Sequence, residues 1–163
     1  MNYYVDNIEY HYKNPALFVS IIDDVYEFTK FANMYYPNYK NWYYDKHIEG
    51  IGNGRTIIFV RDNVTRKIVG VCNLKNNREE KKLCSLYVDE KYRKQGIGFK
   101  LLDYAFNYLR TNKPVFSVNS KNYNDYKNII NGNDWNLKEI LGNYYMYGDC
   151  EYVYNGKIRK KIK

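Results

Sequence analysis

The sequence contains few of the residues that build metal sites and disulfide frameworks. Only two histidines and three cysteines occur among its 163 residues. His11 and His47 stand far apart with no cysteine or carboxylate at ligand spacing, so we expect no metal site. Cys72, Cys84 and Cys150 are odd in number and widely spaced, which argues against a disulfide framework. Cys72 and Cys84 fall in apolar strand patterns and are expected to be buried free thiols.

Long apolar runs and secretory features are also lacking. No stretch approaches the roughly 18 apolar residues of a membrane span, and the Met1-Asn2-Tyr3-Tyr4 start lacks the basic region and apolar run of a signal peptide. We therefore expect a soluble, cytoplasmic protein. The length suits one domain with a sizeable core, and no internal repeat, long linker or low-complexity block divides it. We predict a single domain over residues 1–155 and a basic tail over residues 156–163.

Basic residues exceed acidic ones. The formal net charge is +8, and the tail from Gly156 to Lys163 concentrates part of this excess. Such a tail binds nucleic acid or an acidic surface through nonspecific electrostatics, but basic chain ends are more often solvated and frayed. We therefore give the tail little functional weight. The 21 tyrosines, together with abundant Asn, Lys and Ile, indicate an AT-rich coding sequence more than an aromatic binding surface.

The segment Leu86–Leu109 combines an apolar strand, a basic glycine turn and an amphipathic helix. Gly96 and Gly98 lack the Cβ that would keep a phosphate away, so backbone N–H groups of the turn can face an anion. The first turn of the helix adds unpaired donors and the positive end of the helix dipole, and Arg93 and Lys94 add two cations. Apolar residues recur at helical spacing after the turn, at Ile97, Leu101, Leu102, Ala105, Phe106 and Leu109. The segment predicts a binding site for a diphosphate.

At these residues the chain resembles a known family. The run Val88-x-x-x-x-Arg93-x-x-Gly96-x-Gly98 is similar to the R/Q-x-x-G-x-G/A signature of the GNAT superfamily of acyl-CoA-dependent N-acetyltransferases. The resemblance implies that acetyl-CoA is the co-substrate. It implies that the backbone groups of Leu86, Tyr87 and Val88 pair with the pantetheine arm and polarise the thioester carbonyl. It also implies that the diphosphate is held by Arg93, Lys94, Gln95, Gly96, Ile97 and Gly98.

One further residue carries over from the family. Asn119 ends the strand after the signature helix and matches a family position that often contacts the cofactor or the substrate. An equally good interpretation is a turn residue that ends the strand. The sequence leaves these two roles open.

The rest of the chain can be interpreted in the element order of that family. We expect a first strand over Tyr3–Tyr12, a helix capped by Asp23 or Asp24 that ends at Pro37, and a short helix over Tyr39–Ile48. The remaining elements are strands over residues 55–61, 67–74 and 83–88, a helix from residue 97, a strand over 115–119, a helix over 123–130 and strands within 137–154. The predicted fold class is α/β (α+β), with a GNAT-like mixed, strongly twisted sheet of about six to seven strands flanked by about four helices. In that arrangement the strands over 83–88 and 115–119 splay apart, and the pantetheine arm inserts between them.

The resemblance implies direct attack of a primary amine on the acetyl thioester in a ternary complex. Many members use a tyrosine as general acid, five residues before the aromatic residue of a Gly-Phe pair. Asp134-Trp135 stands where that pair would lie, and five residues before Trp135 is Ile130. Tyr126 follows Asn119 by seven residues, the separation common in the family, and is our candidate general acid. The alternative is that Tyr126 is one more surface tyrosine.

Glu80, early on the signature strand, is the candidate general base, because some members have a glutamate there. The alternative is a solvated charge within the run Arg78–Lys82. The acceptor is not readable, and a small amine, a protein N-terminus and a lysine all remain open. A polycation would need an acidic cleft, and the sequence has no acidic cluster beyond Asp23-Asp24. Aromatic residues that could line an acceptor cleft are Tyr35, Tyr36, Trp42, Tyr43, Tyr145 and Tyr147.

Two other functional classes fit part of the sequence. A catalytically inactive acyl-CoA-binding or sensing module would keep the glycine turn and lack the acid. A nucleic-acid-binding protein would explain the basic charge but not the ordered strand, turn and helix. An acetyltransferase acting on charged tRNA combines the two, on the basis of charge alone. The tyrosine-rich segment Asn143–Tyr154 is a candidate surface for homodimer formation, and we expect no membrane partner.

Overall fold

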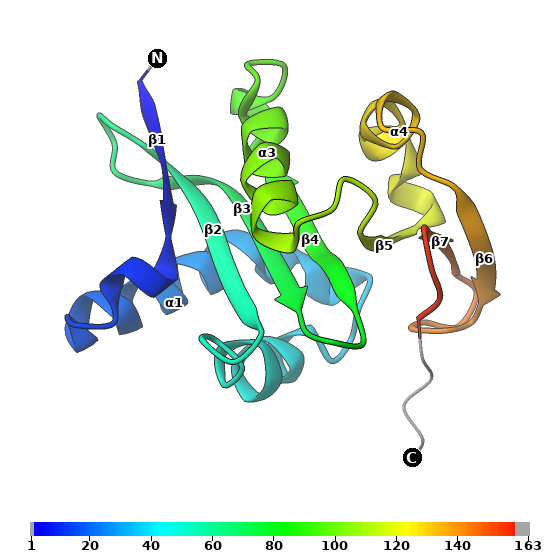
Figure 1. The fold of residues 1–163 in the computed structure, drawn as a ribbon, viewed down its shortest axis with the longest axis horizontal. Helices are drawn as coiled ribbons and strands as arrows, with labels where there is room; N and C mark the ends of the chain where they lie inside the picture. The colour runs from blue at the N-terminus through cyan, green and yellow to red at the C-terminus, as the bar shows by residue number, and fades with distance from the viewer. Residues whose placement is uncertain (1, 159–163) are drawn as a thin grey trace.

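The computed structural model describes residues 2–158 as one mixed seven-stranded sheet with helices on both faces (Figure 1). The strand order is β1-β2-β3-β4-β5-β7-β6, and β4 and β5 are the parallel pair. The strands are β1 Tyr3–Asn7, β2 Arg55–Asp62, β3 Ile68–Asn76, β4 Lys81–Val88, β5 Val115–Asn119, β6 Leu137–Gly142 and β7 Cys150–Tyr154. The α-helices are α1 Pro15–Thr29, α2 Tyr39–Asn41, α3 Ile97–Leu109 and α4 Tyr123–Gly132. The predicted fold class and element order are confirmed.

Helices cover the two faces of the sheet because its central strands alternate between two apolar sides. Along β2, Ile57 and Phe59 pack toward α1 and α2, whereas Ile58 and Val60 pack toward α3. The second short helix continues from α2 into a π-helical segment, η3 Trp42–Ile48, as far as the sequence predicts. None of the helices within residues 2–158 is both long and apolar enough to cross a membrane.

Three predicted boundaries near the N-terminus are wrong. The first strand ends at Asn7, and the side chain of Asn7 caps a short 3-10 helix, η1 Ile8–His11, so the strand does not extend to Tyr12. The first helix begins at Pro15 rather than after Asp23 or Asp24, because Asn14 caps it: the Leu17 N–H donates to Asn14 Oδ1 at 3.1 Å. Asparagine at the cap followed by proline at the first helical position is a favourable start signal. This helix ends at Thr29 rather than at Pro37, and the chain continues only as the 3-10 helix η2 Lys30–Met34.

Strands β4 and β5 separate after a short contact, as the sequence predicts. Their pairing consists of Lys82 with Val115 and Leu83 with Phe116, although β4 continues to Val88 and β5 to Asn119. Strand β4 also carries a bulge: its pairing with β3 passes from Leu83 to Ser85, which leaves Cys84 as the extra residue. Beyond Leu83, β4 stays paired with β3 on one side, but on its other side its backbone groups face the opening instead of β5.

Candidate functional site

The basic glycine turn lies between β4 and α3. Asp89 ends the strand and caps a single 3-10 turn, η4 Glu90–Tyr92, through a hydrogen bond from the Lys91 N–H at 2.9 Å. The Arg93 Nε donates to the Val88 carbonyl at 3.2 Å, and its guanidinium lies 3.7 Å from an oxygen of Asp125 on α4. Arg93 is thus held at the mouth between the two splayed strands, with nearly half of its side chain exposed.

Gly96 is the residue immediately before α3 and takes a left-handed backbone conformation, with φ of 84°. Lys94, at φ of 60°, also has a positive φ. No side chain caps the first turn of α3, so its leading N–H groups are available to an anion. A Cβ placed on Gly96 would meet no atom within 4 Å, so the space beside this turn is open. The turn therefore has the open approach, the free donors and the cations that a diphosphate requires.

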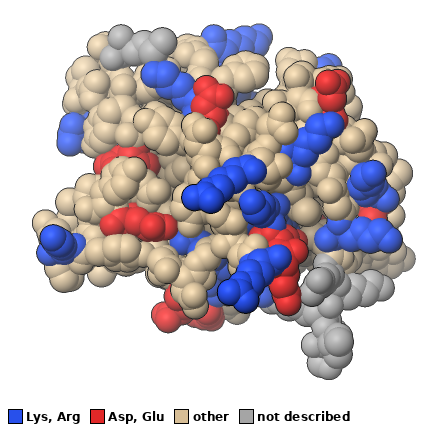
Figure 2. Space-filling view, in the orientation of Figure 1, with Lys and Arg blue, Asp and Glu red and all other residues tan. Residues whose placement is uncertain are grey.

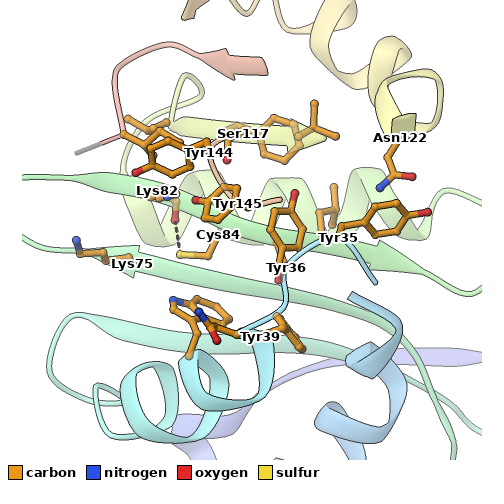
Figure 3. Close-up of a pocket in the computed structure, with 18 of the residues that line it drawn as sticks. Tyr35, Tyr36, Tyr39, Lys75, Lys82, Cys84, Ser117, Asn122, Tyr144 and Tyr145 are labelled. Carbon is orange, nitrogen blue, oxygen red and sulfur yellow. Dashed lines mark hydrogen bonds between the residues drawn. The ribbon is translucent and has the colours of Figure 1, made fainter. Parts of the chain in front are cut away.

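A cavity of about 1220 Å³ extends from the splayed strands across the sheet face that α1 and α2 cover. Leu86, Tyr87 and Tyr126 line one end of it. Figure 3 shows Lys75 and Lys82 at the opposite end of the view from Tyr35 and Asn122, with Tyr36, Ser117 and Tyr145 between them. The cavity is large enough for an extended chain such as the pantetheine arm together with a separate small molecule.

Aromatic residues account for much of the cavity wall. Of the six candidates from the sequence, Tyr35, Tyr36, Trp42 and Tyr145 line it. Tyr43 is instead fully buried beneath α1 and donates to the Ile22 carbonyl at 2.7 Å. Tyr147 is almost fully exposed. The tyrosine pairs of the sequence therefore divide between core, cavity and surface.

Tyr126 reaches the opening between the strands. Its hydroxyl donates to the Leu86 carbonyl at 2.7 Å, and its ring packs against Phe116 of β5. Burial is the main reason that the pKa of Tyr126 is raised, so the phenol stays protonated at neutral pH. Ile130 packs in the core below it. The structure therefore brings the predicted acid to the strand that is predicted to hold the thioester.

Glu80 and Asn119 have partners within the chain. Glu80 lines the cavity just before β4 and accepts a hydrogen bond from Lys75 Nζ at 2.7 Å, six residues before Leu86. At roughly 3.3 Å per strand residue, that separation is about 20 Å along the strand. Asn119 is buried; its amide nitrogen donates to Asp149 at 2.8 Å, and its oxygen accepts from the Lys121 N–H at 2.9 Å. These contacts favour the turn-residue interpretation of Asn119.

A carboxylate that the sequence reasoning missed lies closer to the opening than Glu80. Glu151 on β7 is in register with Asn119 of β5, is buried, and accepts a hydrogen bond from the Tyr36 hydroxyl at 3.1 Å. Burial raises the pKa of Glu151 to about 7, against the opposing effects of hydrogen bonds from Ser117 and Tyr36. Tyr36 and Ser117 both line the cavity, so Glu151 reaches it through them. The only sequence signal was a carboxylate within the apolar run of the last strand.

The first residues of the predicted tail also belong to the cavity wall. Gly156, Lys157 and Ile158 line it, and the Ile158 N–H donates to Glu139 at 3.3 Å. Residues 159–163, the rest of that tail, lie outside the described residues. Within residues 2–158, no group of three His, Cys, Asp or Glu side chains is placed to hold a metal ion.

Comparison with known proteins identifies the family of this chain. The model of the "Acetyltransferase (GNAT) family" matches residues 20–126, about two thirds of the chain, and this range includes the glycine turn and Tyr126. A search of curated proteins finds no match.

Solved structures share the fold. An aminoglycoside 6'-N-acetyltransferase complexed with coenzyme A superposes with a TM-score of 0.62 at 12% identity, over 93% of this chain and 94% of that one. A putative streptothricin acetyltransferase from Bacillus anthracis, in complex with acetyl coenzyme A, gives a TM-score of 0.55 at 17% identity, over 66% of this chain and 65% of that one. A GNAT-family acetyltransferase from Bacillus cereus superposes with a TM-score of 0.52 at 26% identity, over 68% of this chain and 76% of that one.

Proposed function

Because the chain belongs to the GNAT family of acetyltransferases, we propose that it transfers the acetyl group of acetyl-CoA to a primary amine by direct attack in a ternary complex. The observation that carries this proposal is the open, left-handed Gly96 turn directly beside the splayed β4 and β5. This arrangement offers a diphosphate site and two strand edges that no longer pair with each other, in one continuous path. The solved relative that was determined with acetyl coenzyme A supports this choice of co-substrate.

The cofactor would follow that path from the turn into the gap. N–H groups from Gln95 to Gly98 would hold the diphosphate, with Arg93 and Lys94 adding charge. The pantetheine arm would pair with the β5-facing edge of β4 at Leu86, Tyr87 and Val88, in place of a neighbouring strand and of the side-chain hydrogen bonds that Tyr126 and Arg93 donate to the Leu86 and Val88 carbonyls. An N–H of this edge would then stabilise the oxyanion that forms as the amine attacks the thioester carbonyl.

Proton transfer would use groups on both sides of the gap. The acceptor ammonium must lose a proton before it attacks. Tyr36 would accept that proton while its own proton passes to Glu151, a carboxylate whose pKa of about 7 suits a base at neutral pH. Tyr126, held protonated, would donate a hydrogen bond to the departing thiolate. We therefore prefer Glu151 to the predicted Glu80 as the base, because Glu80 is paired with Lys75 at the end of β4 remote from Leu86.

The test of the proposed function combines binding with turnover. Calorimetric titration with acetyl-CoA should show micromolar affinity and similar affinity for CoA, whereas ATP should bind far more weakly. A screen of amines that follows thiol release should then identify an acceptor. Binding of acetyl-CoA without turnover of any amine would point to the inactive acyl-CoA-binding module. Absence of binding would refute the proposal.

A nucleic-acid-binding role receives less support. On the face drawn in Figure 2, lysines and arginines are spread among acidic residues and form no continuous stripe. Binding to nucleic acid with a steep salt dependence would restore that alternative.

Replacement of Tyr126 by Phe should lower kcat for acetyl transfer by about 10- to 100-fold, because the thiolate loses its hydrogen bond. The KM for acetyl-CoA should change little. The matched control is Tyr123→Phe, on the same helix, where the ring packs against Tyr152. Steady-state kinetics of both variants test this prediction. If kcat of Tyr126→Phe equals that of Tyr123→Phe, Tyr126 has no role in the mechanism.

A further inference from the structure

Three cations form a row across the sheet at the end of the cavity remote from the glycine turn. Arg55 of β2 is in register with Lys75 of β3, and Lys75 is in register with Lys82 of β4. Residues directly opposite each other on neighbouring strands share one face and have Cβ atoms about 5 Å apart. All three line the cavity, as Figure 3 shows for Lys75 and Lys82.

This row is electrostatically unfavourable within the chain by itself. Like charges placed directly opposite on a sheet repel each other. Lys75 has one carboxylate partner, Glu80 at 2.7 Å. Among residues 2–158, no carboxylate forms an ion pair with Arg55 or Lys82. In the described part of the chain, Glu80 is therefore the carboxylate ion-paired with the row, while Glu79 lines the same cavity and Lys82 also acts on Glu151, where it lowers the pKa against the larger effect of burial.

Arg55 is only 9% exposed, and its guanidinium is oriented by a hydrogen bond to His47. His47 Nε2 lies 3.1 Å from the Thr56 carbonyl, which can only accept, so this nitrogen carries the proton. The other ring nitrogen, Nδ1, therefore accepts from Arg55 at 3.3 Å. Burial and the nearby Arg55 cation lower the pKa of His47 to about 3, so the ring stays neutral and keeps this role. A buried, oriented guanidinium is suited to binding an oxyanion.

The row is well separated from the cofactor turn. Lys82 and Val88 are six residues apart on β4, or about 20 Å at the usual strand rise, and the turn follows Val88. A cofactor whose diphosphate lies at Gly96 would enter the gap from that end. The row instead borders the part of the cavity that the aromatic side chains of Tyr36, Trp42 and Tyr145 line. An anion bound there belongs to the second substrate.

We propose that the acceptor is an amine that carries an acidic group, a carboxylate or a phosphate, and that Arg55, Lys75 and Lys82 bind this group; this inference rests on the proposed function. Lys82 and Leu86 are four positions apart on β4, or about 13 Å, so the acid lies several bonds from the reacting amine. The amine then faces Tyr36 and Glu151, while the acid faces the cation row. Polycationic acceptors are disfavoured because the row would repel their second charge.

The test uses four amines that differ only at their far end: hexylamine, ω-aminohexanoate, ω-aminohexyl phosphate and hexamethylenediamine. We expect kcat/KM for at least one acid-bearing amine to exceed that for hexylamine by about 10-fold or more, and the diamine to be the poorest. The two acids distinguish a carboxylate from a phosphate. In Lys82→Gln the preference should fall to about 2-fold through KM for the acceptor, with KM for acetyl-CoA unchanged. Lys138→Gln, an exposed lysine on β6, is the control.

A second measurement is independent of turnover. With CoA present to fill the cofactor site, inorganic phosphate or ω-acetamidohexanoate, which has an acid but no free amine, should raise the melting temperature of the wild-type protein and not that of Lys82→Gln. Without these anions, Lys82→Gln should melt no lower than wild type, because it removes repulsion within the row. Equal turnover of hexylamine and both acid-bearing amines would overturn the inference and leave the proposed function intact. If no amine reacts, anion stabilisation that Lys82→Gln abolishes would support the anion site, and its absence would overturn it.

Discussion

Gly96→Asp is expected to reduce the affinity for acetyl-CoA by at least about 100-fold. The position has φ of 84° and open space where a Cβ would lie, so an aspartate fits the fold and directs its carboxylate into the turn. There it repels the diphosphate and occupies the approach to the N–H groups of α3. Calorimetric titration with acetyl-CoA measures this loss.

The chain offers a matched control for that substitution. Gly148 has φ of 86° and also has no atom within 4 Å of an added Cβ, but it precedes β7 rather than the turn. Gly148→Asp introduces the same charge and the same left-handed strain, about 1 kcal/mol in each case. The two variants should have similar free energies of unfolding, but Gly148→Asp should still bind acetyl-CoA. Retained affinity in Gly96→Asp would refute the proposed diphosphate site.

Glu151→Gln should lower kcat/KM for the acceptor at neutral pH by about 100-fold or more, because the proton from the ammonium loses its final acceptor. In the wild-type protein the pKa of Glu151, about 7, predicts that kcat/KM rises with pH through that value. The variant should lack this rise. Glu27→Gln, an exposed carboxylate on α1, is the control. A wild-type pH profile in Glu151→Gln would exclude Glu151 as the base.

Titration of the Glu151 carboxyl should also change stability with pH, in the direction opposite to its effect on activity. Its folded pKa of about 7 lies above the ordinary value of 4.5, so between these values the folded chain binds more protons than the unfolded chain. The free energy of unfolding therefore falls as pH rises from about 4.5 to 7, by on the order of 2–3 kcal/mol. Glu151→Gln removes this loss, and above pH 7 it should be more stable than wild type. Denaturant titrations across that range test the sign; a less stable variant at high pH would contradict it.

Contiguous features were predictable because their physics is local. The glycine turn is a run of adjacent residues, and the element order follows from apolar periodicity and from the turns around Gly50–Gly54 and Asp62–Arg66. The start of α1 carries an equally local signal, Asn14-Pro15, but the sequence analysis predicts a cap at the acidic pair Asp23-Asp24. That error is one of choosing between competing start signals within a single apolar run.

By itself, the sequence determined the family, the fold class and the position of the glycine turn that we propose as the diphosphate site. Only the tertiary structure decided which distant side chains meet. It places Glu151 against Tyr36, 115 residues away, and the Tyr126 hydroxyl against Leu86, 40 residues away. It also aligns Arg55, Lys75 and Lys82 through the register of three strands. Strand register fixes such neighbours, and it depends on the packing of the entire sheet rather than on any local pattern.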